Sequence, residues 1–375
     1  MAAANVVLAS VVLTAACGTG ASSVATQEVD RTKSISVSIG KLDFDFANYC
    51  GDKPVSVGIL DGFAGNAWAV GKNAMLKELL AKCDNIEATY FADANGDVQK
   101  YISSVNSLSA QGANIIETFD YMGQPTVPAF RAAQQNGLLA GSANAIPGNG
   151  KIPTDFSAIT ILDYDSNAEA WVKFATEATN NQGVVAYIGG PAGNLVDAPQ
   201  LEAINREITK QNSGIKIATP EPLVGDWDPA KTQQVMAGLL QKNPDVNVVI
   251  NSYAATGPAV VRAYEAARLP MPVMTGRSSS MELVCLAHNF KDRGLKVQSL
   301  DGTPNLHAIS LAKLLAKWSD VPAPELGPED EITTVQLAEY INTEAGVLPA
   351  CDESVPPGAD FSTALPREQL IAAFN

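Results

Sequence analysis

Two tryptophans and the polar residues beside them are the side chains best suited to hold a small molecule. Trp68 follows Asn66 in a glycine-containing loop, and Trp227 lies between Asp226 and Asp228 in another loop. An indole packs against the apolar face of a ligand, while amides and carboxylates bond its hydroxyl groups, a combination that suits a sugar. The alternatives are core packing for each indole, and helix capping for Asn66 and for at least one of the two aspartates.

Asp163 and Arg277 are further candidates, each with a structural alternative. Arg277 precedes three serines and could bind a carboxylate, or the serines could cap a helix that starts there. Asp163 could contact a ligand or cap the helix that follows it. His288 and His307 have no partner pattern, and we expect both to be structural.

Other kinds of chemistry have no support in the sequence pattern. The run IGGPAGN (188–194) lacks the GxGxxG spacing, and Pro191 removes an amide that a bound phosphate would need. No CxxC or His-rich spacing indicates a metal site, and no GxSxG or Cys–His arrangement indicates a nucleophile. We therefore expect a binding protein without metal, other cofactor or catalytic residue.

The elements that would position these residues alternate between strands and helices. Apolar runs predict strands at 55–60, 87–93, 113–119, 138–143, 158–164, 184–190, 214–224, 246–252, 272–276 and 295–301. Helical patterns lie between most of them, and another follows at 307–318. This alternation predicts parallel sheets with helices on both faces, and the looser segment 144–153 divides the strands into two similar lobes. A last strand-like run, 331–341, lies in a Pro- and acid-rich end that we expect to wrap over one lobe.

Length and charge limit the classes of protein. The 375 residues suffice for two lobes of ordinary domain size. With 40 acidic and 25 basic residues, the net charge is −15. This charge argues against a nucleic-acid partner, because phosphates bind to basic surfaces.

Residues 1–17 have the composition of a secretory leader, with a short apolar core at 6–13 and small residues before Cys17. This pattern indicates a lipoprotein whose acylated Cys17 anchors it to a membrane; an ordinary cleaved signal peptide is the alternative. The lipoprotein is favoured because 18–27 would then form a flexible tether, and we predict that 18–51 as a whole links anchor and lobes. The expected location is the cell envelope, periplasmic or extracellular.

Four further cysteines, Cys50, Cys83, Cys285 and Cys351, predict two disulfides, because an exported protein with an even number tends to pair them. Three connectivities are possible. Cys50 precedes the first strand and Cys83 follows the first helix, positions that come close in a β-α-β unit. We therefore predict Cys50–Cys83 and, by elimination, Cys285–Cys351.

In element order and loop positions, roughly residues 52–330 resemble the periplasmic sugar-binding proteins of the ribose-binding type, the solute receptors of ABC importers. The segments that carry the likeness are GNAWAVG (65–71), ILDYDSNA (161–168), GGPAGNLVDAPQ (189–200), VGDWD (224–228) and NSYAATGPAVVRA (251–263). The resemblance implies an α/β fold of two similar Rossmann-like lobes with parallel sheets, joined by a multi-strand hinge. It implies an N-lobe of 52–161 plus 302–327, and a C-lobe with tail of 162–301 plus 328–375.

In that family, each such loop offers side chains to a sugar between the lobes. The matching positions here are Asn66, Trp68, Asp163, Tyr164, Trp227, Tyr253 and Asp301. Three further candidates depart from the family pattern: Asn144 follows Ala143 where an Asp–Arg pair is common, Gln200 stands for an arginine, and Arg277 for an aspartate. These departures imply a ligand other than ordinary ribose: another sugar, a polyol or a sugar acid.

The resemblance implies a monomeric receptor that binds and does not catalyse. It would close around its ligand at the hinge and deliver it to an ABC permease, touching the membrane only through a lipid anchor. Three alternatives remain open: the sensor half of a chemotaxis or kinase system, a receptor for a nucleoside or signalling molecule, and a secreted enzyme on the same scaffold.

Overall fold

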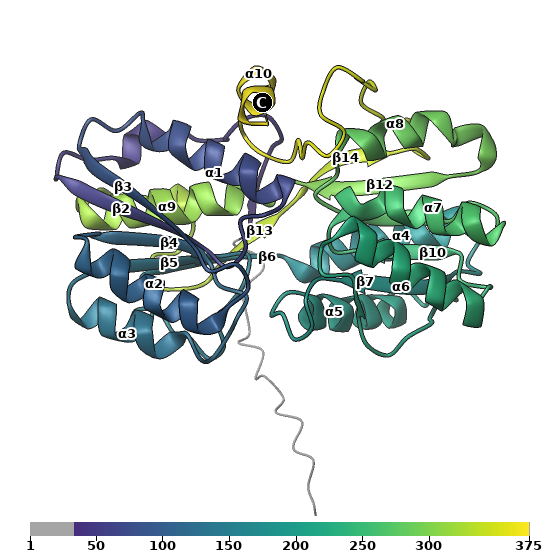
Figure 1. The fold of residues 1–375 in the computed structure, drawn as a ribbon, viewed down its shortest axis with the longest axis horizontal. Helices are drawn as coiled ribbons and strands as arrows, with labels where there is room; N and C mark the ends of the chain where they lie inside the picture. The colour runs from purple at the N-terminus through teal and green to yellow at the C-terminus, as the bar shows by residue number, and fades with distance from the viewer. Residues whose placement is uncertain (1–33, 375) are drawn as a thin grey trace, which may run out of the picture.

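The computed structural model describes residues 34–374, which form two lobes side by side, each built on one sheet (Figure 1). The predicted leader 1–17 with Cys17, and the part of the predicted tether before residue 34, lie outside the described residues. Among the helices of 34–374, none is both long enough and apolar enough to cross a bilayer.

Seven parallel strands form the sheet of the first lobe, on the left of Figure 1. In spatial order they are β1 (Ile35–Ser36), β13 (Thr333–Gln336), β6 (Ala158–Leu162), β5 (Leu139–Ala143), β4 (Ile115–Phe119), β2 (Val55–Asp61) and β3 (Ile86–Asp93). β2 is buried along its whole length, as expected of a strand with helices on both faces. One face is covered by α1 (Ala67–Leu80) and α9 (Asn305–Trp318), and the other by α2 (Val98–Ala110) and α3 (Val127–Gln135).

The second lobe repeats this plan. Its strands, in spatial order, are β14 (Ala338–Asn342), β12 (Lys296–Asp301), β11 (Val273–Arg277), β10 (Val248–Asn251), β7 (Val184–Gly189) and β8 (Lys216–Ile217), with β9 (Leu223–Val224) also beside β7. All pairs are parallel except β12 with β14. One face carries α4 (Tyr164–Ala178) and α5 (Asp197–Lys210), and the other α6 (Pro229–Lys242), α7 (Gly257–Ala267) and α8 (Met281–Asn289).

The predicted fold class, two α/β lobes with parallel sheets, is therefore confirmed. One predicted strand, 214–224, is instead two short strands, β8 and β9. Pro220 and Pro222 lie between them, and proline has no N–H with which to continue a ladder.

Three chain segments cross between the lobes and form the hinge: Asp163 between β6 and α4, residues 302–304 between β12 and α9, and Leu337 between β13 and β14. The crossings lie side by side, because β6 pairs with β13 in one sheet and β12 with β14 in the other. The predicted single strand 331–341 is therefore two strands in different sheets. The last crossing comes after β13, later than the predicted boundary between 327 and 328.

Residues 34–51, predicted as part of the tether, instead pack against the first lobe. β1 pairs with β13, and the short 3-10 helix η2 (Phe46–Tyr49) buries its two aromatic side chains in the core of that lobe. The apolar residues of this segment explain the difference, because burying them stabilises the packed form. Both predicted disulfides are confirmed: Cys50–Cys83 closes this segment onto the end of α1, and Cys285–Cys351 joins α8 to the end of the chain.

The end of the chain contacts both lobes. After the disulfide at α8, Asp360 pairs with the residue before α8, while Leu365 and Leu370 lie in the core of the first lobe. The last helix, α10 (Arg367–Ala373), packs on α1 and lies at the top of Figure 1. We call residues 351–373 the C-terminal strap. The expectation that the tail covers one lobe is thus corrected, since the strap joins the two.

Asp360 is a buried carboxylate within the strap. Its Oδ1 accepts a hydrogen bond from the backbone N–H of Ser362 at 2.8 Å, and its Oδ2 has no partner among the described residues. Burial raises the pKa of Asp360 to about 7, and the negative charge of Asp301 adds to the rise. The folded protein therefore binds a proton at Asp360 more strongly than the unfolded chain does.

We predict that Asp360→Asn flattens the pH dependence of stability between about pH 4 and pH 7. The wild-type free energy of unfolding should fall as the pH rises through this range, by up to ~1.4 kcal/mol per pH unit from one group, because the buried carboxyl must ionise. Asparagine keeps an acceptor for Ser362 and cannot ionise. Denaturant unfolding at several pH values, with the exposed Asp245→Asn as control, checks this; parallel curves for wild type and Asp360→Asn would contradict it.

Candidate ligand-binding site

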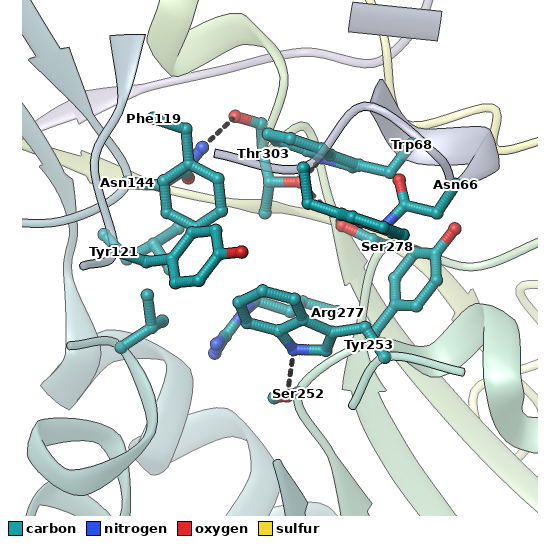
Figure 2. A pocket seen from close by; sticks show the side chains of 14 residues that line it. Asn66, Trp68, Phe119, Tyr121, Asn144, Ser252, Tyr253, Arg277, Ser278 and Thr303 are labelled. Carbon is teal, nitrogen blue, oxygen red and sulfur yellow. Dashed lines mark hydrogen bonds between the residues drawn. The ribbon is translucent and has the colours of Figure 1, made fainter. Parts of the chain in front are cut away.

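Fourteen side chains enclose a cavity between the two lobes (Figure 2). The empty volume between these side chains is about 540 Å³, a figure that includes solvent at the open side of the cavity. The first lobe contributes Phe63, Asn66, Trp68, Phe119, Tyr121, Asn144 and Leu162, the second contributes Val196, Trp227, Ser252, Tyr253, Arg277 and Ser278, and Thr303 lies in the hinge. Most of these residues stand at or just beyond the carboxyl ends of parallel strands, where α/β sheets present their ligand sites.

Aromatic rings from both lobes meet across this cavity. The ring centroids of Trp68 and Phe119 are 5.6 Å apart, and those of Phe119 and Tyr121 are 5.3 Å apart. Trp227 reaches over from the second lobe, with its ring 5.5 Å from Tyr121 and 6.0 Å from Phe119. These are ordinary distances for favourable aromatic pairs. The cavity thus offers extended ring faces on two sides.

The backbone around Trp227 is shaped to present its ring. Asp226 and Trp227 both have left-handed φ values, 55° and 52°. This conformation is uncommon for a bulky residue such as tryptophan, whereas glycine, asparagine and aspartate adopt it more readily. The indole lies over Gly190, where a Cβ atom would come within 2.1 Å of the ring. Its Nε1–H donates to Ser252 Oγ at 3.0 Å. A tight turn, a glycine and a serine hydroxyl therefore hold an indole that remains partly exposed.

Thr303 connects the two walls of the cavity. Trp68 Nε1–H donates to Thr303 Oγ1 at 2.8 Å, and Ser278 Oγ lies 2.6 Å from the same oxygen. Trp68 belongs to the first lobe and Ser278 to the second, whereas Thr303 lies in the hinge between them. Both the indole and the threonine are largely buried, so their hydrogen bond also satisfies a donor that water could not reach.

Asn144 offers an acceptor to the cavity. Its Nδ2 lies 3.0 Å from His307 Nε2, and His307 Nδ1 lies 2.7 Å from Glu117 Oε1. Burial lowers the pKa of His307 well below its usual value, so the ring is neutral at pH 7 and Nε2 can accept from the amide. Asn144 Oδ1 then remains buried and without a partner among the described residues, next to the cavity that Asn144 lines.

Six of the ten predicted contact residues lie in the cavity wall: Asn66, Trp68, Asn144, Trp227, Tyr253 and Arg277. Two of them also have the structural role that the sequence left open, helix capping for Asn66 and core packing for Trp68. Asn66 caps α1, since its Oδ1 accepts from Ala69 N at 2.9 Å, and Trp68 is only 9 % exposed. Asp228, the neighbour of Trp227, caps α6.

The other four predicted residues, Asp163, Tyr164, Gln200 and Asp301, lie outside the lining set. Asp163 caps α4 by accepting from Ser166 N at 3.0 Å. Gln200 donates to the carbonyl of Tyr164 at 2.9 Å and accepts from Arg277 at 3.3 Å, so it supports a residue of the wall. Asp301 accepts from Ser279 N at 3.1 Å, and burial raises its pKa to about 6.

The lining residues that the sequence did not single out are Phe63, Phe119, Tyr121, Leu162, Val196, Ser252, Ser278 and Thr303. Several sit next to residues that were predicted: Ser252 precedes Tyr253, and Ser278 follows Arg277. A usable signal existed for Phe119, which ends the predicted strand 113–119, and for Tyr121, which lies two residues beyond it.

A metal centre is not assembled in this part of the molecule. Across residues 34–374, no group of three or more His, Cys, Asp or Glu side chains is placed to hold a metal ion. The wall instead combines aromatic rings with amide, hydroxyl and guanidinium groups, which is the chemistry of non-covalent recognition of a small polar molecule.

Comparison with protein families gives one match. Residues 57–286 match the family model described as "Periplasmic binding protein domain". Among curated proteins, none matches the sequence at a significant level.

Solved structures share the fold over about four fifths of this chain. A solute-binding protein of an ABC transporter from Thermobispora bispora has a TM-score of 0.65 and 19 % identity, over 82 % of this chain and 90 % of that one. The periplasmic binding component of an arabinose ABC transporter from Shewanella, bound to L-arabinofuranose, has a TM-score of 0.68 and 15 % identity, over 85 % and 98 %. A periplasmic solute-binding protein from Actinobacillus succinogenes with bound D-allose has a TM-score of 0.64 and 17 % identity, over 78 % and 98 %.

We predict that Thr303→Val lowers the free energy of unfolding of the ligand-free protein by ~1–3 kcal/mol, because the buried Trp68 N–H loses its acceptor while the side chain keeps its shape. Thr303→Ser, which retains the hydroxyl, is the matched control and should lose much less. Denaturant unfolding of the three proteins measures this. Equal stability of the valine and serine variants would show that the hydrogen bond from Trp68 to the Thr303 hydroxyl does not stabilise the fold.

Proposed function

Because the chain belongs to the periplasmic binding protein family, we propose that it is the substrate-binding component of an ABC importer. The observation that carries this proposal is the cavity between the lobes, whose wall is assembled from the strand ends of both sheets and from the hinge. A ligand in this position would contact both lobes at once and so favour their closed arrangement over an open one.

The ligand we propose is a small polyhydroxylated molecule: a sugar, a polyol or a sugar acid. Trp68, Phe119 and Trp227 offer ring faces on which the C–H groups of a sugar ring can pack. Asn144, Ser252 and Tyr253 offer polar groups for its hydroxyls. The similar structures from Shewanella and Actinobacillus hold arabinofuranose and D-allose, which supports the choice of carbohydrate.

The proposed setting is the cell envelope outside the cytoplasm. Two disulfides favour an oxidising compartment, and the family is periplasmic by description. We further propose that a monomer is anchored through acylated Cys17 and delivers its ligand to a membrane permease. In this function the protein binds and releases its ligand unchanged.

A ligand panel tests the proposal. The purified protein is titrated with pentoses, hexoses, polyols and sugar acids, and tryptophan fluorescence and the melting temperature are recorded. A true ligand should raise the melting temperature, because it binds only the folded state, and should change the emission of the indoles in the wall. If no member of the panel changes either signal and nucleosides do, the carbohydrate assignment is wrong and the protein is a nucleoside receptor.

The substitution that tests the proposed site most directly is Trp227→Ala. We predict that it weakens binding of the sugar found in the panel by ~1–3 kcal/mol, the scale of one aromatic contact in a desolvated site. The free energy of unfolding should change little, since the indole is partly exposed. Calorimetric titration and denaturant unfolding measure the two effects. Trp318→Ala, a partly exposed tryptophan away from the cavity, is the control and should leave affinity unchanged.

Replacing Trp68 and replacing Trp227 should have different effects on stability. Trp68 is buried and hydrogen-bonded, so Trp68→Ala should lower the free energy of unfolding by ~3–5 kcal/mol as well as weaken binding. A large stability loss for Trp227→Ala, with unchanged affinity, would place that ring in the core and remove it from the proposed site.

A further inference from the structure

Arg277 is the one charged side chain among the fourteen that line the cavity. It ends β11 and is only 4 % exposed, and it is one of the labelled residues of the wall in Figure 2. The remaining lining residues are neutral: aromatic, aliphatic, amide or hydroxyl. The cavity therefore presents a single positive charge in apolar surroundings, where its interaction with an anion is screened far less than on the surface.

The guanidinium of Arg277 has more donors than partners. It has five N–H groups, and it donates to Gln200 Oε1 at 3.3 Å. The nearest carboxylate oxygen, Asp197 Oδ1, lies 3.9 Å from Nη2, which is an ion-pair distance and too long for a hydrogen bond.

Asp197 is oriented by three other donors and lies beyond hydrogen-bonding distance of the guanidinium. Tyr187 donates to its Oδ1 at 3.0 Å, and Gly190 N and Asn194 Nδ2 both donate to its Oδ2 at 2.6 Å. The carboxylate thus offsets part of the charge of Arg277 from behind, which makes burial of the arginine tolerable. It leaves N–H groups of the guanidinium for another acceptor in the cavity.

We propose, on the basis of the function proposed above, that the ligand is a sugar acid or polyol acid whose carboxylate is bound by Arg277. A carboxylate matches the fork of a guanidinium and can accept two parallel hydrogen bonds. A neutral hydroxyl would accept one bond and add no negative charge to the part that Asp197 supplies. The single charge of a carboxylate also matches a wall with a single cation, whereas a phosphate dianion would be left with excess charge in an apolar site.

Matched ligand pairs test the proposal directly. Calorimetric titrations compare D-galacturonate with D-galactose, D-glucuronate with D-glucose, and D-gluconate with D-glucitol, so that each pair differs mainly in the carboxylate. Wild type should bind the acid of at least one pair about 10- to 100-fold more tightly than its neutral partner, the range of a charge-assisted hydrogen bond. Glucose 6-phosphate is included, and a preference for it would overturn the carboxylate assignment.

Three variants locate the effect. Arg277→Gln should bind the acid and its neutral partner with equal affinity, and Arg277→Lys should keep only part of the preference, because lysine retains the charge without the fork. Arg262→Gln, an exposed arginine of α7 paired with Glu282, should keep the full preference. Denaturant unfolding verifies that each variant is folded. If Arg277→Gln does not fold, the affinities of wild type and Arg277→Lys for the same acid and neutral pairs test the proposal.

The outcomes separate this inference from the function it rests on. If neutral sugars bind as tightly as their acids in wild type, or if Arg277→Gln keeps the preference for the acid, the carboxylate proposal is wrong while the carbohydrate receptor stands. If neither acids nor neutral members of the panel bind, the proposed function itself fails.

Discussion

The hydroxyl group of Thr303 joins the two walls of the cavity at the hinge. It accepts from the indole of Trp68 on one side and lies within hydrogen-bonding distance of Ser278 on the other, while its own backbone passes between the lobes. Three crossings side by side hold this position, because each belongs to a strand paired with its neighbour. The hinge is therefore also part of the cavity wall, and a change in the relative position of the lobes must move atoms that line the cavity.

Three residues of the cavity wall have an uncommon backbone conformation. Asn144, Trp227 and Ser278 all line the cavity and all have left-handed φ values, 69°, 52° and 60°. For Trp227 and Ser278 this conformation costs of order 1 kcal/mol and persists only where the surrounding contacts stabilise it, whereas asparagine adopts it more readily. Those contacts are present: a neutral histidine beside Asn144, a serine and a glycine beside the indole, and the threonine hydroxyl beside Ser278. Strain and support together fix the directions of groups that would otherwise point elsewhere.

Much of the fold could be read from the sequence because the alternation of apolar runs with helical patterns is regular, and both disulfides followed from the positions of Cys50 and Cys83. The site was harder. Periodicity locates the end of a strand but not which of the next two or three residues faces the cavity, so Asp163 was singled out and its neighbour Leu162 lines the wall. In the same way Asp301 was chosen instead of Thr303. The strand-like run 331–341 misled because two short strands in different sheets have the same pattern as one long strand.

The C-terminal strap is attached differently at its two ends: a disulfide joins its start to α8 in the second lobe, and apolar side chains hold its end in the first lobe. The disulfide to α8 can be opened only by reduction, whereas Leu365 and Leu370 can leave the first lobe and return reversibly. Between these attachments, Val355 and Ala359 pack in the core of the second lobe. Any rotation of one lobe against the other must therefore bend the short segment after Asp360 or detach those two leucines. The strap therefore opposes rotation of one lobe against the other through residues that lie outside the cavity wall, so that resistance to hinge motion and ligand contacts belong to different parts of the chain.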